Sequence, residues 1–201
     1  MSGPGTWLRS RDGQVIDLDV GRWRGEPCRQ EARLLDSVLD PVLDVGCGPG
    51  RIVAALGGQG RMAMGIDPAP AAAAEARRRG AAVLCRSVFD PLPGEGRWGT
   101  VLLLDGNVGI GGAPRVLLAR CRALLQPGGE VVAELGPPGA PSAPLTVRVE
   151  VGSSVGPWFD WAVVAADRWA DLARGAGLEP AGLEEAEGRW FARARRLHSV
   201  S

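Results

Sequence analysis

Three glycines at alternate positions, framed by two acidic residues, are the part of this sequence best suited to chemistry. A short apolar run contains Asp44 and continues into Gly46, Gly48 and Gly50, and a second apolar run ends at Asp67. Glycine is required where the backbone adopts a positive φ or lies close to a ligand. A carboxylate at the end of a strand can accept hydrogen bonds from both hydroxyls of a ribose. The spacing therefore predicts a strand, a tight turn, a helix and a second parallel strand that bind a ribose-containing ligand.

Three later segments extend this pattern along the chain. They are residues 87–93 (SVFDPLP), 102–107 (LLLDGN) and 124–129 (LLQPGG). Together with the glycine-rich turn and the acid of the second strand, they resemble the motifs of the class I S-adenosylmethionine-dependent methyltransferases. In that family the three segments are the loop that holds the adenine, the end of the fourth strand and the turn before the fifth strand. The five motifs follow in order and cover roughly residues 30 to 135.

The resemblance implies that S-adenosyl-L-methionine is the cofactor. The residues that it assigns to the cofactor are Asp44, Gly46, Cys47, Gly48, Gly50, Asp67, Pro68, Ser87, Val88 and Asp105. Asp67 would bind the ribose, and Asp44 would orient the turn or reach the methionine end of the cofactor through water. Ser87 and Asp90 are alternative partners for the adenine, since either side chain can accept a hydrogen bond.

Residues after the fourth predicted strand and in two flanking loops are the candidates for the methyl acceptor. Asp105 and Asn107 are assigned as catalytic, Asp105 as the base for a hydroxyl or carbon acceptor. Asn107, the only asparagine in the chain, is also assigned to acceptor binding. Trp23, Trp158 and Phe159 are expected to wall an apolar pocket with few polar groups. The alternative is that these aromatic side chains only hold their loops onto the core.

Other functions are weighed against methyl transfer to a small molecule by in-line displacement. The chain could bind the cofactor to regulate a partner, or act on the sulfonium as a lyase or cyclase. A nicotinamide-dependent dehydrogenase is disfavoured, because its G-x-G-x-x-G turn needs a third glycine where this chain has Arg51. The chain has no lysine and no tyrosine, which excludes a Schiff base, a P-loop and a Tyr-Lys catalytic pair.

Net charge and cysteine content indicate which binding partners and which cellular compartment to expect. The formal net charge is zero, so nothing indicates binding to nucleic acid or to an anionic membrane surface. No apolar run is long enough to span a bilayer, and the polar N-terminus does not resemble a signal peptide. Four widely spaced cysteines and one histidine, His198, indicate neither a metal site nor a disulfide framework. We therefore expect a cytoplasmic enzyme that acts on a small molecule without a metal.

Apolar periodicity places these motifs on alternating strands and helices. The pattern predicts an α/β fold with a doubly wound, mostly parallel, seven-stranded sheet of the Rossmann-like methyltransferase type. Strands are expected at 42–46, 61–66, 81–88, 99–104 and 130–135, and helices at 31–39, 51–57, 70–79 and 114–125. In such a sheet, ligands bind at the carboxyl ends of the strands, where all the motifs lie.

A single domain, residues 1–201, is expected, with an addition at each side of the motif-bearing core. Residues 1–29 would form an N-terminal hairpin over 6–19 and a loop over 21–27 that serves as a lid. Residues 136–166 would form a β-insertion after the fifth strand, with strands at 145–151 and 161–165. A helix at 167–176 and an antiparallel pair at 178–187 and 189–196 would complete the chain.

Overall fold

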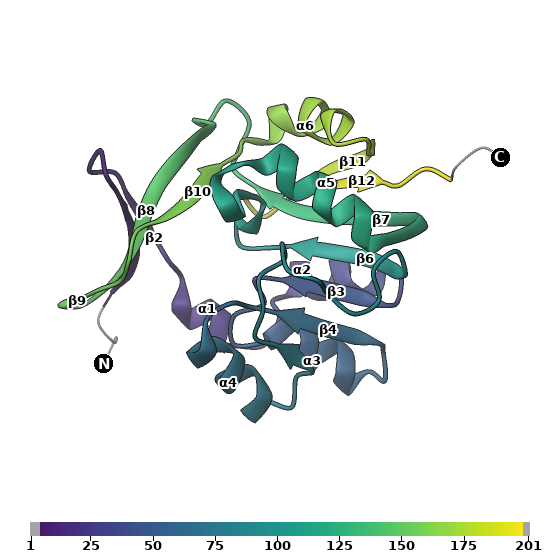
Figure 1. The fold of residues 1–201 in the computed structure, drawn as a ribbon, viewed down its shortest axis with the longest axis horizontal. Helices are drawn as coiled ribbons and strands as arrows, with labels where there is room; N and C mark the ends of the chain where they lie inside the picture. Colours follow the sequence, from purple (N-terminus) through teal and green to yellow (C-terminus); the bar gives the residue numbers. More distant parts are fainter. Residues whose placement is uncertain (1–4, 199–201) are drawn as a thin grey trace.

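The computed structural model of this chain describes residues 5–198 and contains two β-sheets, with helices packed on both faces of the larger one (Figure 1). The larger sheet has seven strands in the order β11-β12-β7-β6-β3-β4-β5. The five strands from β7 to β5 are parallel to one another, whereas β12 and β11 are antiparallel additions. The strands are β3 (Val42–Val45), β4 (Ala63–Ile66), β5 (Val83–Leu84), β6 (Trp98–Leu103), β7 (Leu125–Leu135), β11 (Glu179–Ala186) and β12 (Arg189–Arg195).

Alternate side chains of the parallel strands point to opposite faces of this sheet, and each face has its own core. Leu43 and Leu103 pack with α5 and α6 on one face, and Val42 and Leu102 pack with α2 and α3 on the other. The helices are α2 (Arg29–Asp36), α3 (Arg51–Gly58), α4 (Pro70–Arg78), α5 (Pro114–Leu124) and α6 (Trp169–Gly175), with short 3-10 helices η1 (Asn107–Gly112) and η2 (Ala166–Arg168). Strands buried on both faces confirm the predicted doubly wound α/β class.

A second, five-stranded antiparallel sheet joins two segments that are far apart in the sequence. Its order is β10-β8-β1-β2, and β9 pairs with β8. The strands are β1 (Thr6–Ser10), β2 (Val15–Asp17), β8 (Ala143–Val151), β9 (Ser154–Val155) and β10 (Phe159–Val163). β1 lies between β2 and β8, so the N-terminal strands and the segment after β7 form one unit rather than two additions. This sheet projects from the side toward which β4 and β6 point (Figure 1).

Three local expectations were wrong. Residues 21–27 were expected to be a loop, but Val20–Arg24 forms the short helix α1, where Asp19 accepts a hydrogen bond from the Arg22 N–H at 2.9 Å. The fifth strand was expected to start after the Pro-Gly-Gly turn, but β7 begins at Leu125, because Leu125 already pairs with Trp98 of β6. The strand expected at 81–88 is only two residues long, since its one partner, β4, ends at Ile66.

The helices are short. Among residues 5–198, none is long and apolar enough to cross a membrane.

Candidate functional site

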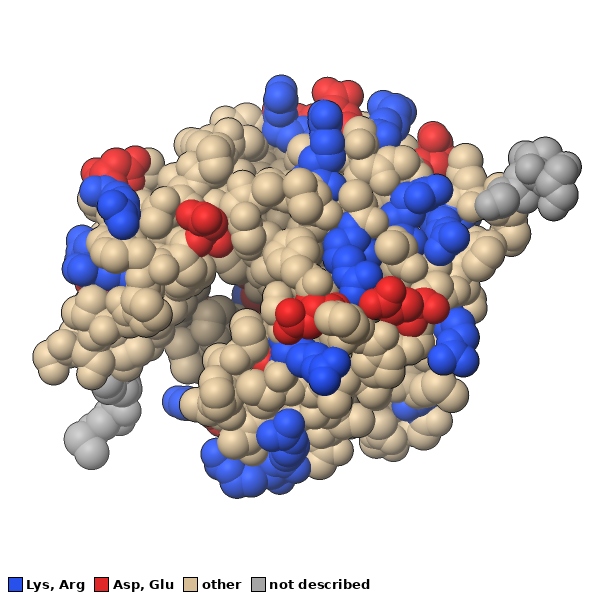
Figure 2. Space-filling model, in the orientation of Figure 1, with Lys and Arg blue, Asp and Glu red and all other residues tan. Residues whose placement is uncertain are grey.

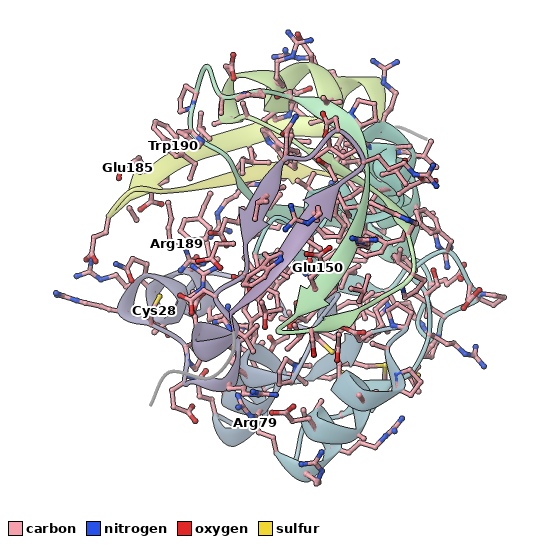
Figure 3. All side chains as sticks on the ribbon, turned by 90° about the vertical axis from the view of Figure 1, so that its left-hand side faces the viewer. Cys28, Arg79, Glu150, Glu185, Arg189 and Trp190 are labelled. Carbon is pink, nitrogen blue, oxygen red and sulfur yellow. The ribbon has the colours of Figure 1, made fainter. Side chains whose placement is uncertain are left out.

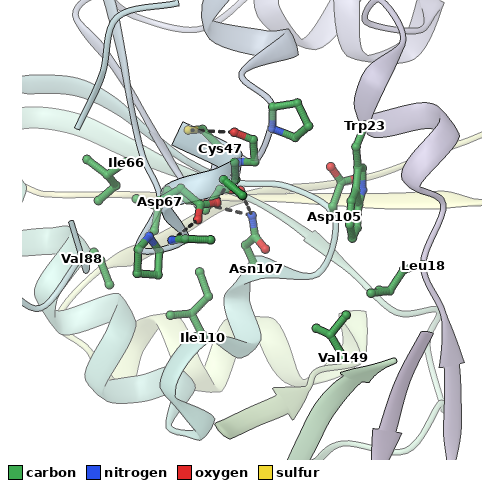
Figure 4. A pocket seen from close by; sticks show the side chains of 18 of the residues that line it. Leu18, Trp23, Cys47, Ile66, Asp67, Val88, Asp105, Asn107, Ile110 and Val149 are labelled. Atoms are coloured by element: carbon green, nitrogen blue, oxygen red, sulfur yellow. Dashed lines mark hydrogen bonds between the residues drawn. The ribbon is translucent and has the colours of Figure 1, made fainter. Parts of the chain in front are cut away.

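A cavity of about 570 Å³ lies between the carboxyl ends of the parallel strands and the second sheet. Its floor includes the residues that follow β3, β4 and β6, at Gly46, Asp67 and Asp105. Leu8 of the second sheet lines the opposite wall. Figure 4 shows three more residues of this wall: Val149 from the same sheet, Trp23 from α1, and Leu18 from the segment between β2 and α1. In the space-filling view the cavity opens as a hollow between the projecting sheet and the main body (Figure 2). The predicted motifs thus meet at one cavity of a size typical for small ligands.

The glycine-rich turn needs its glycines for two different reasons. All three glycines have a positive φ, at 72° for Gly46, 52° for Gly48 and 77° for Gly50. A Cβ at Gly50 would lie 2.8 Å from the Cβ of Ala76, so this glycine permits the close packing of α3 against α4. A Cβ at Gly48 would meet no atom within 4 Å, so this position is open to a ligand that approaches the backbone.

Asp67 connects the turn to the start of α4. One of its oxygens accepts a hydrogen bond from the Gly48 N–H at 3.0 Å, and the other accepts one from the Ala69 N–H at 2.8 Å. Burial raises the pKa of this carboxyl above its ordinary value, although both backbone donors act in the opposite direction. Carboxylate oxygens have further lone pairs, so Asp67 retains acceptor capacity for the hydroxyls of a diol.

Asn107 reaches from the end of β6 across to the end of β3. Its Nδ2 donates to the carbonyl oxygens of Val45 at 2.9 Å and Gly46 at 3.0 Å (Figure 4). A Cβ at Gly46 would lie 2.7 Å from this nitrogen, which is why residue 46 must be a glycine. Both amide hydrogens are therefore used to hold the turn, and the side-chain oxygen is the atom left for a ligand.

Asp105 lies in the cavity wall, and both oxygens of its carboxylate are held in ion pairs. One oxygen pairs with the Arg22 guanidinium of α1, and the other pairs with Arg51 of α3 at 2.8 Å. The residue has a positive φ of 56°, and its N–H donates to a carboxylate oxygen of Glu134 at 2.8 Å. In this arrangement Asp105 anchors α1 and α3 to the end of β6, and its role as a base stays a prediction.

Arg51, the residue that breaks the dehydrogenase pattern, belongs to a buried network of charges. It is 3% exposed and pairs with Glu31 of α2, which is fully buried, as well as with Asp105. Burial alone would raise the pKa of Glu31, but the Arg51 guanidinium lowers it to about 2. Arg189 of β12 extends the network to Glu134 at 2.7 Å and to the Cys28 sulfur at 3.2 Å (Figure 3). The network links α1, α2, α3, β6, β7 and β12 beside the cavity.

Two other residues assigned to the cofactor lie against the turn. Asp44, only 3% exposed, lies in β3 just before the turn and is not among the residues of the cavity wall, and burial raises its pKa to about 7. Cys47 lines the cavity, but burial and the nearby Asp44 raise the pKa of its thiol, which leaves it a poor nucleophile.

At the other end of the cavity, Ser87 and Val88 line the wall beside Pro68, whereas Asp90 does not. Asp90 instead accepts a hydrogen bond from the Ser87 N–H at 3.1 Å, and the Ser87 hydroxyl accepts one from the Phe89 N–H at 3.3 Å. Of the two alternatives for an adenine partner, Ser87 is therefore the one that faces the cavity.

The aromatic residues expected at the acceptor divide into two groups. Trp23 and Phe159 line the cavity. Trp158 lies outside it, with Arg11 and Arg148 at 5.2 and 4.8 Å from its ring centre. Placing Trp158 in the pocket wall was thus wrong, because its ring packs against the guanidinium groups of Arg11 and Arg148 instead.

Sequence reasoning indicated Trp161 as a further residue that could line an aromatic pocket, and it does line the cavity, but it missed the wall residues Leu8, Leu18 and Val149. No local signal identifies them, since they reach the cavity only through the pairing of β1, β8 and β10. Arg51 did carry a signal, as a large basic residue at a position where a related turn requires glycine.

Residues 42–129 match a family model described as a methyltransferase domain. A comparison with curated proteins found no match. A methyltransferase from Bacteroides fragilis, solved with S-adenosyl-L-homocysteine, superposes with a TM-score of 0.81 at 20% identity, over 98% of this chain and 90% of that one. The 1,6-didemethyltoxoflavin-N1-methyltransferase of Burkholderia thailandensis gives 0.60 at 24% identity, over 78% and 71%. The sugar N-methyltransferase KedS8 of a Streptoalloteichus species gives 0.58 at 23%, over 78% and 80%. At such identities the structures show a shared fold.

Proposed function

We propose that this chain, whose residues 42–129 match a methyltransferase-domain model, transfers a methyl group from S-adenosylmethionine to a small-molecule acceptor by in-line displacement. The observation that carries the proposal is the cavity at the strand ends, which contains the glycine-rich turn, Asp67 and Ser87 in one wall. Solved structures of the same fold contain S-adenosylhomocysteine, one of them together with a small-molecule substrate. The cavity is large enough for a cofactor with an acceptor beside it.

The residues of the wall fit the cofactor part by part. Asp67 would accept hydrogen bonds from the ribose hydroxyls, and Ser87 with the Val88 backbone would bind the adenine. The open side of Gly48 leaves room for the amino-acid part, and Asp44 just before the turn would reach that part through water. Pro68 and Cys47 would contribute apolar contacts.

S-adenosylmethionine, when bound, supplies a methyl group on a positively charged sulfur, so the protein mainly has to position the acceptor and exclude water. Trp23 and Phe159 would form apolar walls for the acceptor, and the Asn107 oxygen would accept a hydrogen bond from it. Asp105 holds α1, and with it Trp23, in place over the cavity. All four cysteines are free thiols, and we infer a reducing compartment such as the cytoplasm, where disulfides are rare.

Calorimetric titration with S-adenosylhomocysteine and incubation with labelled S-adenosylmethionine test the proposal. Binding of the first, and release of S-adenosylhomocysteine with a labelled acceptor from the second, are expected. Binding without consumption would instead support a regulatory protein. Breakdown of the cofactor to products other than S-adenosylhomocysteine would support a lyase or cyclase.

A further inference from the structure

Resting on this proposed function, we propose that the acceptor is an uncharged aromatic nitrogen heterocycle, bound in the half of the cavity that faces the second sheet. We call this half the acceptor chamber; its walls are Leu8, Leu18, Trp23, Val149, Phe159 and Trp161. The cofactor half of the same cavity lies over the glycine-rich turn, Asp67 and Ser87. The chamber differs from it in polarity, in aromatic content and in charge.

The sheet side of the acceptor chamber is apolar. Leu8 and Val149 are directly paired across β1 and β8, and both line the cavity. Their strand neighbours Trp7 and Glu150 are also paired and bond to each other on the opposite face, where the indole N–H donates to the carboxylate at 2.9 Å. Because side chains alternate along a strand, Trp7 and Glu150 are turned away from the chamber. An acceptor that binds there leaves water and contacts apolar side chains instead.

Three aromatic side chains form the remaining walls. Phe159 and Trp161 are in edge-to-face contact, with ring centres 6.2 Å apart, and Trp23 comes from α1. Aromatic rings favour such offset or edge contacts with another ring. The buried Trp23 Nε1 has no hydrogen-bond partner among the described residues, but one donor serves only one hydroxyl. An acceptor with many hydroxyl groups would therefore lose more hydrogen bonds to water here than it regains, which costs free energy for each group left unpaired. The walls therefore favour an aromatic acceptor over a sugar.

The charged groups bordering the chamber favour an uncharged acceptor. The carboxylate of Asp105 is paired with Arg22 and Arg51, and Arg24 is paired with Glu75 at 3.2 Å. These guanidinium groups are therefore already neutralised. Asp160 is an exposed carboxylate that also borders the cavity and would repel an anion. Of the arginines that line the cavity, Arg86 has no carboxylate partner among the described residues, but it lies next to Ser87 in the cofactor half and donates to the Pro91 carbonyl oxygen. A phenolate, thiolate or phosphate-bearing acceptor in the chamber would therefore find no free cation beside it.

A ring nitrogen also removes the need for a base. Its lone pair attacks the methyl carbon, the bond from that carbon to sulfur breaks, and the electron pair of the bond returns to sulfur. The positive charge moves from sulfur to the ring nitrogen, and no proton has to leave. The reaction therefore needs no base, which agrees with a cavity in which both oxygens of Asp105 are held in ion pairs. The aromatic walls are attracted to a cation before and after transfer.

The test is binding of quinoline to the protein saturated with S-adenosylhomocysteine, measured by calorimetry, followed by mass detection of N-methylquinolinium after incubation with S-adenosylmethionine. Glucosamine is the polar comparison. Phe159→Ala should weaken quinoline binding roughly fivefold or more, since an aromatic contact is lost. Val149→Thr, which adds a hydroxyl at nearly constant volume, should weaken it too. Trp158→Ala is the matched control, one residue away and outside the cavity, and should leave quinoline binding unchanged.

The outcomes separate this inference from the proposed function. Failure of the protein to bind S-adenosylhomocysteine would sink the proposed function itself. Three results would overturn the aromatic acceptor while S-adenosylhomocysteine still binds normally. They are no binding of quinoline, tighter binding of glucosamine than of quinoline, and equal effects of the Phe159 and Trp158 variants. The cofactor site would not be affected by any of them. Unchanged affinity of each variant for S-adenosylhomocysteine shows that the variant is folded.

Discussion

Asp67 is the residue on which cofactor affinity should depend most, because its carboxylate serves both the protein and the proposed ribose. Asp67→Ala removes a charged acceptor and should cost about 1.5–3 kcal/mol of S-adenosylhomocysteine binding free energy. Calorimetric titration measures this loss. Asp67→Asn, which keeps one oxygen for the Gly48 N–H, should give a smaller loss. An affinity that both variants leave intact would place the ribose elsewhere.

Asp44 should make stability depend on pH in an unusual direction. Burial raises its pKa from an ordinary 3.8 to about 7, so between these values the folded chain holds a proton that the unfolded chain has released. The contribution of Asp44 to the free energy of unfolding therefore falls as the pH rises from about 4 to about 7. Below pH 4 this contribution does not change with pH. The full difference corresponds to about 4 kcal/mol.

Urea unfolding of the wild type and of Asp44→Asn at pH 4 and pH 8 measures this effect. The asparagine variant should gain stability relative to wild type between the two pH values, since it has no proton to lose. The comparison between the two proteins cancels carboxyls such as Glu31, whose lowered pKa acts in the opposite direction at acid pH. A difference that does not vary with pH would mean that Asp44 is ionised throughout.

At the scale of elements, the buried charges decide how α1, α2 and α3 sit around the cavity. α1 has only five residues, too few for a stable helix in isolation. It is held by the Arg22–Asp105 pair. It is also held by hydrogen bonds from Arg79, the residue after α4, to the carbonyl oxygens of Arg24 and Gly25 (Figure 3). These contacts fix the position of α1 and therefore keep Trp23 in the wall of the cavity.

Arg51 is the centre of this arrangement. Arg51→Ala would leave Glu31, which has no exposed surface, with only part of its counter-charge. Breaking a buried pair in this way typically costs about 3–5 kcal/mol of unfolding free energy. Urea denaturation measures it, with the exposed Arg33 of α2 as the matched control: Arg33→Ala should change stability by less than about 0.5 kcal/mol. Equal effects at the two arginines would show that the network contributes little.

At the scale of the whole molecule, ligand binding should stabilise the fold selectively. S-adenosylhomocysteine at a hundred times its dissociation constant should add about 2.7 kcal/mol. For a domain of this size that corresponds to a rise in Tm of roughly 5–10 °C. NAD and NADP should give no comparable shift, because Arg51 and its ion pairs fill the position at which a dinucleotide-binding turn needs glycine. A larger shift with NAD would contradict the assigned cofactor.

The local features of this protein follow from the sequence alone. Gly50 could be recognised because a positive φ and a close helix contact both exclude a side chain there, and Asp67 because it ends a short apolar run. The match of residues 42–129 to a methyltransferase-domain model confirms the family resemblance that these motifs indicated. Parallel strands and short crossovers then bring such residues to one edge of the sheet with little freedom.

Only the tertiary structure decided which side chains lie across the cavity from the residues at the strand ends. The pairing of β1 with β8 joins segments about 140 residues apart, and no local pattern encodes it. The register of β10 on β8 places Phe159 and Trp161 in the cavity wall, since moving a strand by one residue exchanges its two faces. The roles of Asp105 and Arg51 likewise depend on ion partners from distant elements. The sequence therefore determined the cofactor side, whose geometry is local, and the three-dimensional packing determined the acceptor side, whose walls come from strands that meet only in the folded chain.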